Sequence, residues 1–453
     1  MTSSALPREP KGNPILGHAL SLSGNALPFL LASAADYGDL IPLRFFGKRI
    51  LFVNHPDHIA HVLATCHRQV VKGISRRSDH ILLGDGISLS EGNVWRRERR
   101  LIQSAFYRER LAAYGADVVA LTERTREGWC DGETRDLEVE LTKLTMEIVG
   151  KTLFGIDAGD NAELATAVSH AMACRAARVK SPQMLLPDRF PAPTTLRLRQ
   201  ARRRLDAIVQ RRIDARRRAA DDRDDLLALL LKARDEDGRA LSDQQVRDEV
   251  VTIFVGGHET VADLLAWTWY LLSQHPEVEA SLLAELDATL GGQLPTVADL
   301  SRLPYAGMVV SEVLRLYPPA SVLTREVITD FAIDGYRVVP GTEIVMSPWV
   351  MHRDPRYFAD PEAFRPERWA DGLASRLPRY AYFPFGGGPR LCIGKAFATM
   401  EAMLVLATVV PRVHLALLPG QRVEAEEIPT LHPKDGLPMV LQSRRCLKSG
   451  GER

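Results

Sequence analysis

Apolar residues recur at spacings of three and four over most of the chain, and this pattern predicts a mainly helical protein. Successive amphipathic helices are expected from Leu111 to Val168, and an arginine-rich helix from Thr194 onward. A longer helix is predicted from Ser242 to Gln274, because Ser242-Asp-Gln-Gln245 is a capping box and Pro276 ends the pattern. These helices account for most of the expected core.

Alternation with period two is confined to short stretches. Residues 41–53 alternate on either side of Gly47-Lys48, which predicts two strands joined by a tight turn. Residues 327–346 alternate around two further turns and predict strands that complete a small sheet. Residues 73–91 are expected to form a loop that carries apolar side chains, and residues 171–193 a less regular connection. The fold class is therefore mainly α with a minor β region.

The domain organisation follows from the continuity of this pattern. We expect one domain over residues 1–453, with a proline-containing lead-in at about 1–35 and a flexible tail at 445–453. Residues 13–35 carry no Asp, Glu, Lys or Arg, but Pro, Gly and Asn interrupt them, so we predict no membrane span and a cytoplasmic protein.

Composition excludes several classes of protein. The net charge of +1 provides no basic excess for nucleic acid. The cysteines are odd in number and lack paired spacing, which argues against a disulfide framework or a zinc knuckle and favours a reducing compartment. They are Cys66, Cys130, Cys174, Cys392 and Cys446.

Two groups of polar residues are interpreted as structural. His55, His58 and His61 follow one another at three-residue spacing, but Pro56 and the apolar residues among them favour a plain amphipathic helix over a metal site. The arginine runs 202–204 and 216–218 are interpreted as a solvated helical surface.

One cysteine occupies a setting with clear chemical consequences. Cys392 follows the glycine-rich turn Phe383-Pro-Phe-Gly-Gly-Gly-Pro-Arg and precedes a helix-like run, Lys395 to Val410. Unsatisfied backbone N–H groups and the positive end of a helix favour thiolate over thiol there. The glycines permit tight bending and close approach to a flat group, so a haem iron with one axial thiolate fits this stretch.

The middle of the long predicted helix has a local weakness. Gly256 and Gly257 are adjacent, and each destabilises a helix by roughly 1 kcal/mol relative to alanine. Close packing of another helix would explain them. A groove that admits dioxygen and water would explain them equally well, with Thr260 as a hydroxyl donor and Glu259 as the acid beside it.

The chain resembles the cytochrome P450 haem-thiolate monooxygenases in the loop that carries the iron ligand. Phe385, Gly388, Arg390, Cys392 and Gly394 match the family's ligand-loop pattern. This resemblance implies haem b with Cys392 as its axial thiolate and with Phe385 and Gly394 beside it. It extends over nearly the whole chain.

The resemblance also assigns roles outside the loop. Gly-Gly-x-Glu-Thr at 256–260 matches the family's oxygen-activation motif, which makes Gly256, Gly257, Glu259 and Thr260 the candidate catalytic residues. The implied haem-propionate contacts are Trp95, Arg99, Arg325 and Arg390. Glu312 and Arg315 are expected to form a scaffold network with Arg368.

The implied function is insertion of one oxygen atom from O2 into a lipophilic small molecule, by hydroxylation or epoxidation. A terpenoid, fatty acid or polyketide-like substrate is expected. No dinucleotide fingerprint, iron–sulfur cysteine cluster or flavin domain is recognisable, so electrons from NAD(P)H would arrive through a separate ferredoxin or flavodoxin and its reductase. Arg96, Arg97 and Arg100 form either a solvated face or a docking patch for that donor.

Two alternatives remain open at this stage. A peroxide-driven peroxygenase or an isomerase would need no external electrons, but the Glu259-Thr260 pair argues against it. A haem-binding sensor without chemistry would have no use for that pair.

Overall fold

The computed structural model describes residues 8–444, except 25, 74, 157, 182, 184–185, 187, 189, 220–224 and 235–237. The expected tail at 445–453 and Cys446 lie outside these residues. Backbone contacts divide the chain into two compact units, which are described separately. The first comprises residues 1–80, 314–364 and 369–392, and the second comprises 81–313, 365–368 and 393–453. The single domain over 1–453 stays a prediction.

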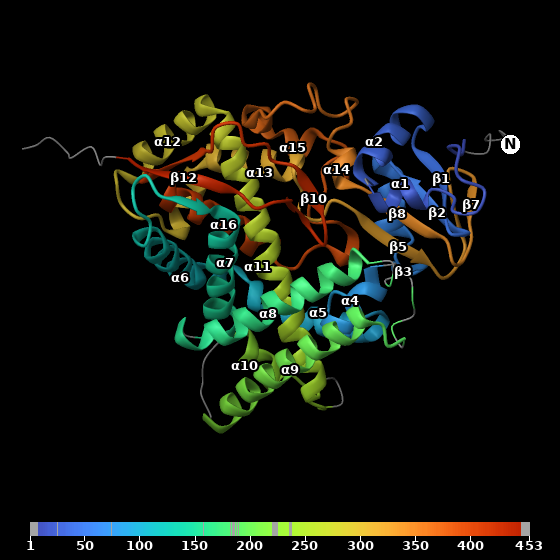
Figure 1. Cartoon of the computed structure of the whole chain (residues 1–453), viewed down its shortest axis with the longest axis horizontal. Helices are drawn as coiled ribbons and strands as arrows, with labels where there is room; N and C mark the ends of the chain where they lie inside the picture. The colour runs from blue at the N-terminus through green and yellow to red at the C-terminus, as the bar shows by residue number, and fades with distance from the viewer. Residues whose placement is uncertain are drawn as a thin grey trace, which may run out of the picture. The chain divides into compact units, whose positions relative to one another are not determined.

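The first unit contains a five-stranded sheet in the order β1-β2-β8-β5-β3, with strands from distant parts of the sequence (Figure 1). Leu43 pairs with Ile50 across the turn at Gly47, which confirms the predicted hairpin. A separate hairpin, β6–β7, and β8 confirm strands within 327–346. The strands are β1 (Leu40–Phe45), β2 (Lys48–Val53), β3 (Val70–Lys72), β5 (Leu323–Val327), β6 (Phe331–Ile333), β7 (Tyr336–Val338) and β8 (Glu343–Met346).

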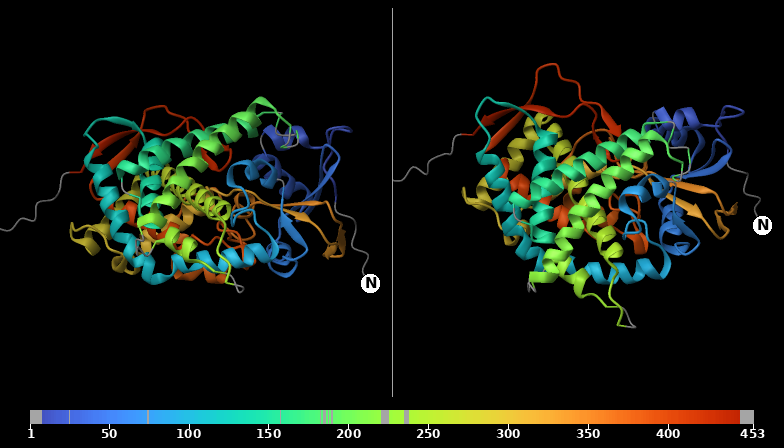
Figure 2. Two further views of the ribbon diagram at one scale, coloured as in Figure 1. Left: turned by 90° about the horizontal axis from the view of Figure 1, so that it is seen from below. Right: turned by 60° about the horizontal axis from the view of Figure 1, so that its bottom comes forward.

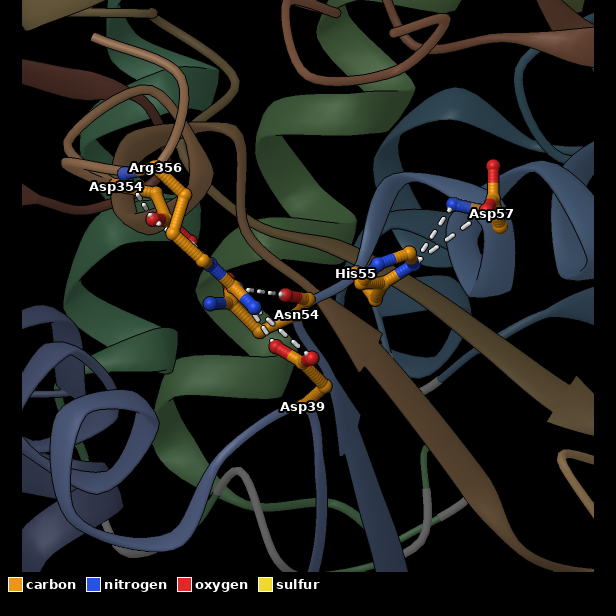
Figure 3. Close-up of polar contacts among 6 residues, drawn as sticks. All are labelled: Asp39, Asn54, His55, Asp57, Asp354 and Arg356. Carbon is orange, nitrogen blue, oxygen red and sulfur yellow. Dashed lines mark hydrogen bonds and ion pairs between the residues drawn. The ribbon is translucent and has the colours of Figure 1, made fainter.

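Short helices surround this sheet. His55 is the N-cap of α3, where its Nδ1 accepts from the backbone N–H of Asp57 at 3.2 Å (Figure 3), so the interpretation of 55–61 as helix holds. The helical elements of this unit are α1 (Ala19–Gly24), α2 (Ala26–Tyr37), α3 (Pro56–Ala60), the π-helical η1 (His61–Thr65), α14 (Pro348–Met351), α15 (Leu373–Arg376) and the 3₁₀ turn η6 (Gly388–Arg390).

An arginine fixes the coil that follows α14. The Arg356 guanidinium donates to Asp39 at 2.7 Å, to Asp354 at 2.6 Å and to the carbonyl of Asn54 at 3.2 Å (Figure 3). Hydrogen bonds to Asp39 and Asp354 raise the pKa of Arg356 further. The coil is thereby attached to the start of β1 and the end of β2, as expected of an ordered segment.

The second unit is built on α11, which covers Asp243–Gln274. Ser242 and Gln245 form the predicted capping box, and the helix ends where Pro276 begins the next one. The other helical elements are α5 (Gly92–Gln103), η2 (Ser104–Phe106), α6 (Arg108–Glu127), α7 (Leu137–Phe154), α8 (Ala158–Val179), α9 (Pro193–Ala219), α10 (Leu226–Lys232), α12 (Pro276–Leu290), η4 (Val297–Arg302) and α16 (Lys395–Val409). Two helices, α4 (Ser75–Leu83) and α13 (Pro304–Leu316), and the 3₁₀ element η5 (Pro366–Gly372) cross between the units.

Helices α7 and α16 pack on α11, and α8 packs along α9 (Figure 2). Two small sheets complete this unit, β4-β12-β9 and the hairpin β10-β11. Their strands are β4 (Thr134–Asp136), β9 (Val413–Leu417), β10 (Ala425–Glu427), β11 (Leu431–Pro433) and β12 (Pro438–Ser443). The prediction of a mainly helical protein with a minor β region is confirmed.

Three local predictions were wrong. Residues 171–179 continue helix α8 rather than beginning a less regular connection. Residues 75–83 form helix α4 rather than loop, because burial of Leu82 and Leu83 favours one packed face over exposed coil. Arg202 does not belong to a solvated surface: it is 8% exposed and donates to Asp206, Asp248 and the carbonyl of Leu82. The arginine run 202–204 therefore contains one buried residue, Arg202, beside two exposed ones.

By length and composition alone, α11 would qualify as a membrane span, with a mean hydropathy of 1.2 in its best window. In the structure 78% of that window is buried, as in the core helix of a globular unit. No other helix of the described residues meets the same criteria.

Candidate active site

The cysteine loop belongs to the first unit and is shaped by its glycines. The backbone N–H of Cys392 donates to the carbonyl of Phe385 at 3.0 Å, which closes the loop. Gly388 has φ +63°, and a Cβ there would lie 1.9 Å from the Leu63 carbonyl oxygen. A Cβ at Gly387 would lie 2.0 Å from a ring carbon of Tyr380. Glycine is therefore required for both backbone conformation and close approach.

A buried histidine supports the start of this loop, and sequence reasoning missed it. His352 Nε2 accepts from the backbone N–H of Phe383 at 2.9 Å, while Nδ1 donates to the Arg315 carbonyl at 3.2 Å. Burial, then the Arg315 charge, lowers the pKa of His352 well below its usual value. The imidazole is therefore neutral and keeps the one tautomer that satisfies both contacts.

The predicted side chains of this unit lie on three segments. Cys392 is exposed, and Phe385 and Arg390 are partly buried in the same loop. Arg325 lies on β5, is 7% exposed, and donates to the Thr324 carbonyl at 2.8 Å. The sulfur is thus accessible while its loop is fixed by backbone contacts.

The motif at 256–260 belongs to the second unit and interrupts the burial of α11. Residues 248–255 and 261–269 are buried, whereas Gly256 is exposed and Glu259 and Thr260 are only partly buried. A Cβ at Gly256 would meet nothing within 4 Å, but one at Gly257 would lie 3.0 Å from Val149 of α7. Gly257 therefore permits close packing of α7, as the first alternative expects, and Gly256 leaves one turn of α11 open. Admission of dioxygen and water at this turn stays a prediction.

The open turn carries a polar side chain on its edge. The hydroxyl of Thr260 donates to the Gly256 carbonyl at 3.0 Å. This bond occupies a carbonyl in the middle of the helix and orients the hydroxyl toward the turn that lacks a Cβ. Gly256, Glu259 and Thr260 thus lie on one open turn of α11, and their catalytic role stays a prediction.

The remaining predicted contacts of this unit lie at two helix positions. Trp95 and Arg99 are four residues apart on α5 and share one face, both partly buried. Arg96 and Arg100 are exposed on the same helix. Gly394 precedes α16, and its carbonyl accepts from the N–H of Ala398 at 2.8 Å, which begins that helix.

Two buried glutamates near the motif were not anticipated. Glu98 of α5 and Glu249 of α11 are 2% and 1% exposed, and their side chains are hydrogen-bonded to each other. Glu249 Oε2 also accepts from the backbone N–H of Ile87 at 3.1 Å. Burial, then the Glu98 charge, raises the pKa of Glu249 to about 9, so this carboxyl is neutral near pH 7. Glu98 lies within the arginine-rich run 96–100, so the sequence did not indicate that it is buried.

The Glu312–Arg368 pair of the predicted scaffold network is present in the second unit. Arg368 Nε donates to Glu312 Oε1 at 2.8 Å, and the Arg365 N–H donates to the same oxygen at 3.0 Å. Glu312 is fully buried, so its charge depends on these donors. Arg315 donates to the carbonyls of His352, Pro361 and Ala363.

The chemistry of these residues fits a haem group. Cys392 is exposed, on a loop that contains three consecutive glycines. Arg325 and Arg390 in the first unit, and Arg99 and Trp95 in the second, are of the types that would supply charge-assisted and N–H donors to propionate carboxylates. Together with a mainly helical fold, this set defines the class of haem-thiolate oxygenases.

Comparison with known proteins makes the assignment specific. Residues 7–438 match the family model described as "Cytochrome P450", and the chain belongs to the cytochrome P450 family. Its relatives include proteins named as a monooxygenase and as an oxygenase, and this protein is an oxidoreductase, a cytochrome P450 monooxygenase.

Three relatives and one solved structure illustrate the similarity. Cyclooctat-9-en-7-ol 5-monooxygenase of Streptomyces melanosporofaciens is 37% identical, with 91% of this chain and 90% of the relative covered. Cyclooctatin synthase of the same organism is 35% identical, with 91% of both chains covered. Pentalenene oxygenase of Streptomyces avermitilis is 35% identical over 94% of this chain and 95% of the relative. The structure described as "Retinoic acid bound cyanobacterial CYP120A1" is 28% identical, with a TM-score of 0.88 over 98% of this chain and 100% of that chain.

Proposed function

We propose that this protein inserts one oxygen atom from O2 into a lipophilic terpenoid, using haem b bound through Cys392. The observation that carries the proposal is the open turn of α11, where Thr260 and Glu259 stand on an otherwise buried helix. Two relatives carry the names of cyclooctat-9-en-7-ol and pentalenene, which favours a terpenoid over the fatty acid or polyketide alternatives.

The chain's own residues have separable tasks. Haem with a thiolate ligand supplies the redox chemistry that activates O2. Cys392 provides the thiolate, and the backbone bond to Phe385 fixes its loop. Arg325, Arg390, Arg99 and Trp95 would hold the haem propionates through hydrogen bonds, charge-assisted for the three arginines. Thr260 presents its hydroxyl at the open turn, and Glu259 holds the proton that this hydroxyl passes on.

The axial ligand is tested with carbon monoxide. The reduced wild-type protein should show the strongly red-shifted Soret band of thiolate-ligated haem, and Cys392→Ala should lose it. Cys130→Ala is the matched control, because Cys130 is exposed and lies outside the loop. A wild-type band at the position of neutral-ligand haem would refute the assignment of Cys392.

The substrate class is tested by binding and turnover. Pentalenene and cyclooctat-9-en-7-ol should shift the spin state of the haem, and 18O2 should label one oxygen atom of the product. A shift with fatty acids alone would overturn the terpenoid proposal. Product formation with peroxide but none with a ferredoxin–reductase system would favour the peroxygenase alternative.

Electron supply is proposed to come from a separate, acidic ferredoxin or flavodoxin. Arg96 and Arg100 are exposed on α5, on the helix that also carries Arg99. Changing both to glutamate should slow reduction about tenfold, with loss of the salt dependence and no change in substrate affinity. An unchanged reduction rate would exclude this docking surface.

A further inference from the structure

Another acid, Asp263, lies on α11 one turn beyond the proposed catalytic pair. Asp263 follows Glu259 by four residues and Thr260 by three, so the three side chains share one side of the helix. Asp263 is only 4% exposed. It therefore has no direct exchange with solvent, although it neighbours the acid that the proposed mechanism uses.

Among the described residues, the surroundings of Asp263 provide one hydrogen bond, and no cation is among the groups that shift its pKa. The hydroxyl of Thr430, in the β10–β11 turn, donates to its carboxyl group. The indole N–H of Trp267, one turn further along α11, donates to the Leu431 carbonyl at 2.8 Å and fixes this turn on the helix. Asp263 Oδ2 is buried and has no hydrogen-bond partner among the described residues. A buried carboxylate oxygen in that condition is strongly destabilised, which favours the protonated acid.

Two further acids interact with Asp263. Burial raises the pKa of Asp263 well above its usual value, and the charges of Glu259 and then Glu138 raise it further. Glu138 lies in the first turn of α7 and is partly exposed. Burial, then Asp136, then Glu259 raise the pKa of Glu138 to about 7, which suits exchange of protons with water at neutral pH.

We propose that Asp263 is a positioning residue for proton delivery, which stores a proton behind Glu259 and returns it to that carboxylate, with Glu138 as the connection to solvent. The transfers balance without a redox step. Glu259 carboxylate takes the proton of Asp263, Asp263 carboxylate takes the proton of Glu138, and Glu138 takes a proton from water. The proposal rests on the proposed roles of Glu259 and Thr260.

The first test measures the proton itself and does not depend on turnover. The infrared spectrum of the holoenzyme at pH 7 should contain a protonated-carboxyl C=O band that shifts in D2O and is absent from Asp263→Asn. Thr268→Val is the matched control, because Thr268 is another buried polar residue of α11 whose hydroxyl donates to Leu264. If Asp263→Asn loses no such band, Asp263 is ionised and the proposal is wrong.

The second test measures coupling of electrons to product, with pentalenene as the probe. Asp263→Asn should lower product formed per NAD(P)H about tenfold, since general acid–base groups contribute factors of 10²–10⁴ and a relay acts through one of them. Asp263→Glu should restore part of the coupling, and Thr268→Val should not change it. Carbon monoxide spectra should be the same for all variants.

The outcomes distinguish failure of the relay through Asp263 from failure of the proposed roles of Glu259 and Thr260. If Glu259→Gln and Thr260→Ala remain fully coupled, the proposed roles of the pair fail. If those variants uncouple while Asp263→Asn stays coupled, only the relay fails. Loss of coupling in Asp263→Asn without rescue by glutamate, together with an unchanged infrared band, would reduce Asp263 to a structural residue and overturn the proposal.

Discussion

Replacing Glu249 by glutamine should change the pH dependence of stability. Glu249 is 1% exposed and its pKa is raised to about 9 by burial first and by Glu98 second, whereas an unfolded glutamate titrates near 4.5. Between these values the folded protein binds more protons than the unfolded chain, so its stability falls as pH rises. Glutamine stays neutral and can still accept from the N–H of Ile87, so Glu249→Gln should remove this loss.

The size of the effect follows from the proton count. One proton contributes about 1.4 kcal/mol per pH unit, so three units from pH 5.5 to 8.5 correspond to at most about 4 kcal/mol. Because Glu98 shares the site and its own pKa is also raised by burial, part of the change remains in the variant. We therefore expect Glu249→Gln to gain about 2–4 kcal/mol relative to wild type over this interval.

The assay is unfolding in guanidinium chloride, followed by circular dichroism at pH 5.5, 7.0 and 8.5, with wild type and variant compared at each pH. Glu123→Gln is a control of opposite sign, because its hydrogen bond with Arg126 lowers the pKa of Glu123. That variant should lose the same amount of stability at all three pH values, because the whole interval lies above the unfolded pKa of a glutamate. If the difference between wild type and Glu249→Gln is constant from pH 5.5 to 8.5, Glu249 is not protonated and the reasoning is refuted.

Two further predictions concern the scaffold and the cysteine loop. Arg368→Ala should lower the free energy of unfolding by about 3–5 kcal/mol, because it leaves the buried charge of Glu312 without this arginine. Denaturant midpoints measure the change, and a loss below about 1 kcal/mol would contradict the prediction. Gly388→Ala should abolish the thiolate-type carbon monoxide spectrum through its clash with the Leu63 carbonyl of η1, whereas Gly420→Ala, also at positive φ but with open space, should keep it. A normal spectrum in Gly388→Ala would show that the loop tolerates displacement.

Elements with local signals were predictable from the sequence. The bounds of α11 follow from the capping box at Ser242 and from Pro276, and the β1–β2 hairpin follows from alternation around Gly47. Residues 75–83 carried no comparable signal, because their helix depends on burial of Leu82 and Leu83 within the fold. Local patterns thus determine an element's bounds only where its ends are encoded nearby in the sequence.

The residue types and spacing of the candidate site were predictable from the sequence, but the neighbours that surround each residue were not. The residues 256–260 and the loop to Cys392 could be identified from residue types and spacing alone. Which of Gly256 and Gly257 packs against a neighbour depended on Val149, more than a hundred positions earlier. His352 could not be found either, because its function in the fold is to satisfy one backbone N–H and one carbonyl.

The acids of α11 show why such environments escape sequence reasoning. Asp248 is paired with Arg202, Glu249 shares a buried site with Glu98, and Asp263 accepts from the hydroxyl of Thr430. These three carboxyls on one helix therefore have different environments, because their partners come from other elements. A carboxyl without a cation must hold a proton to remain buried, and beside Glu259 a stored proton is what repeated turnover consumes. The condition that destabilises an ionised Asp263 is thus the same one that would make it useful.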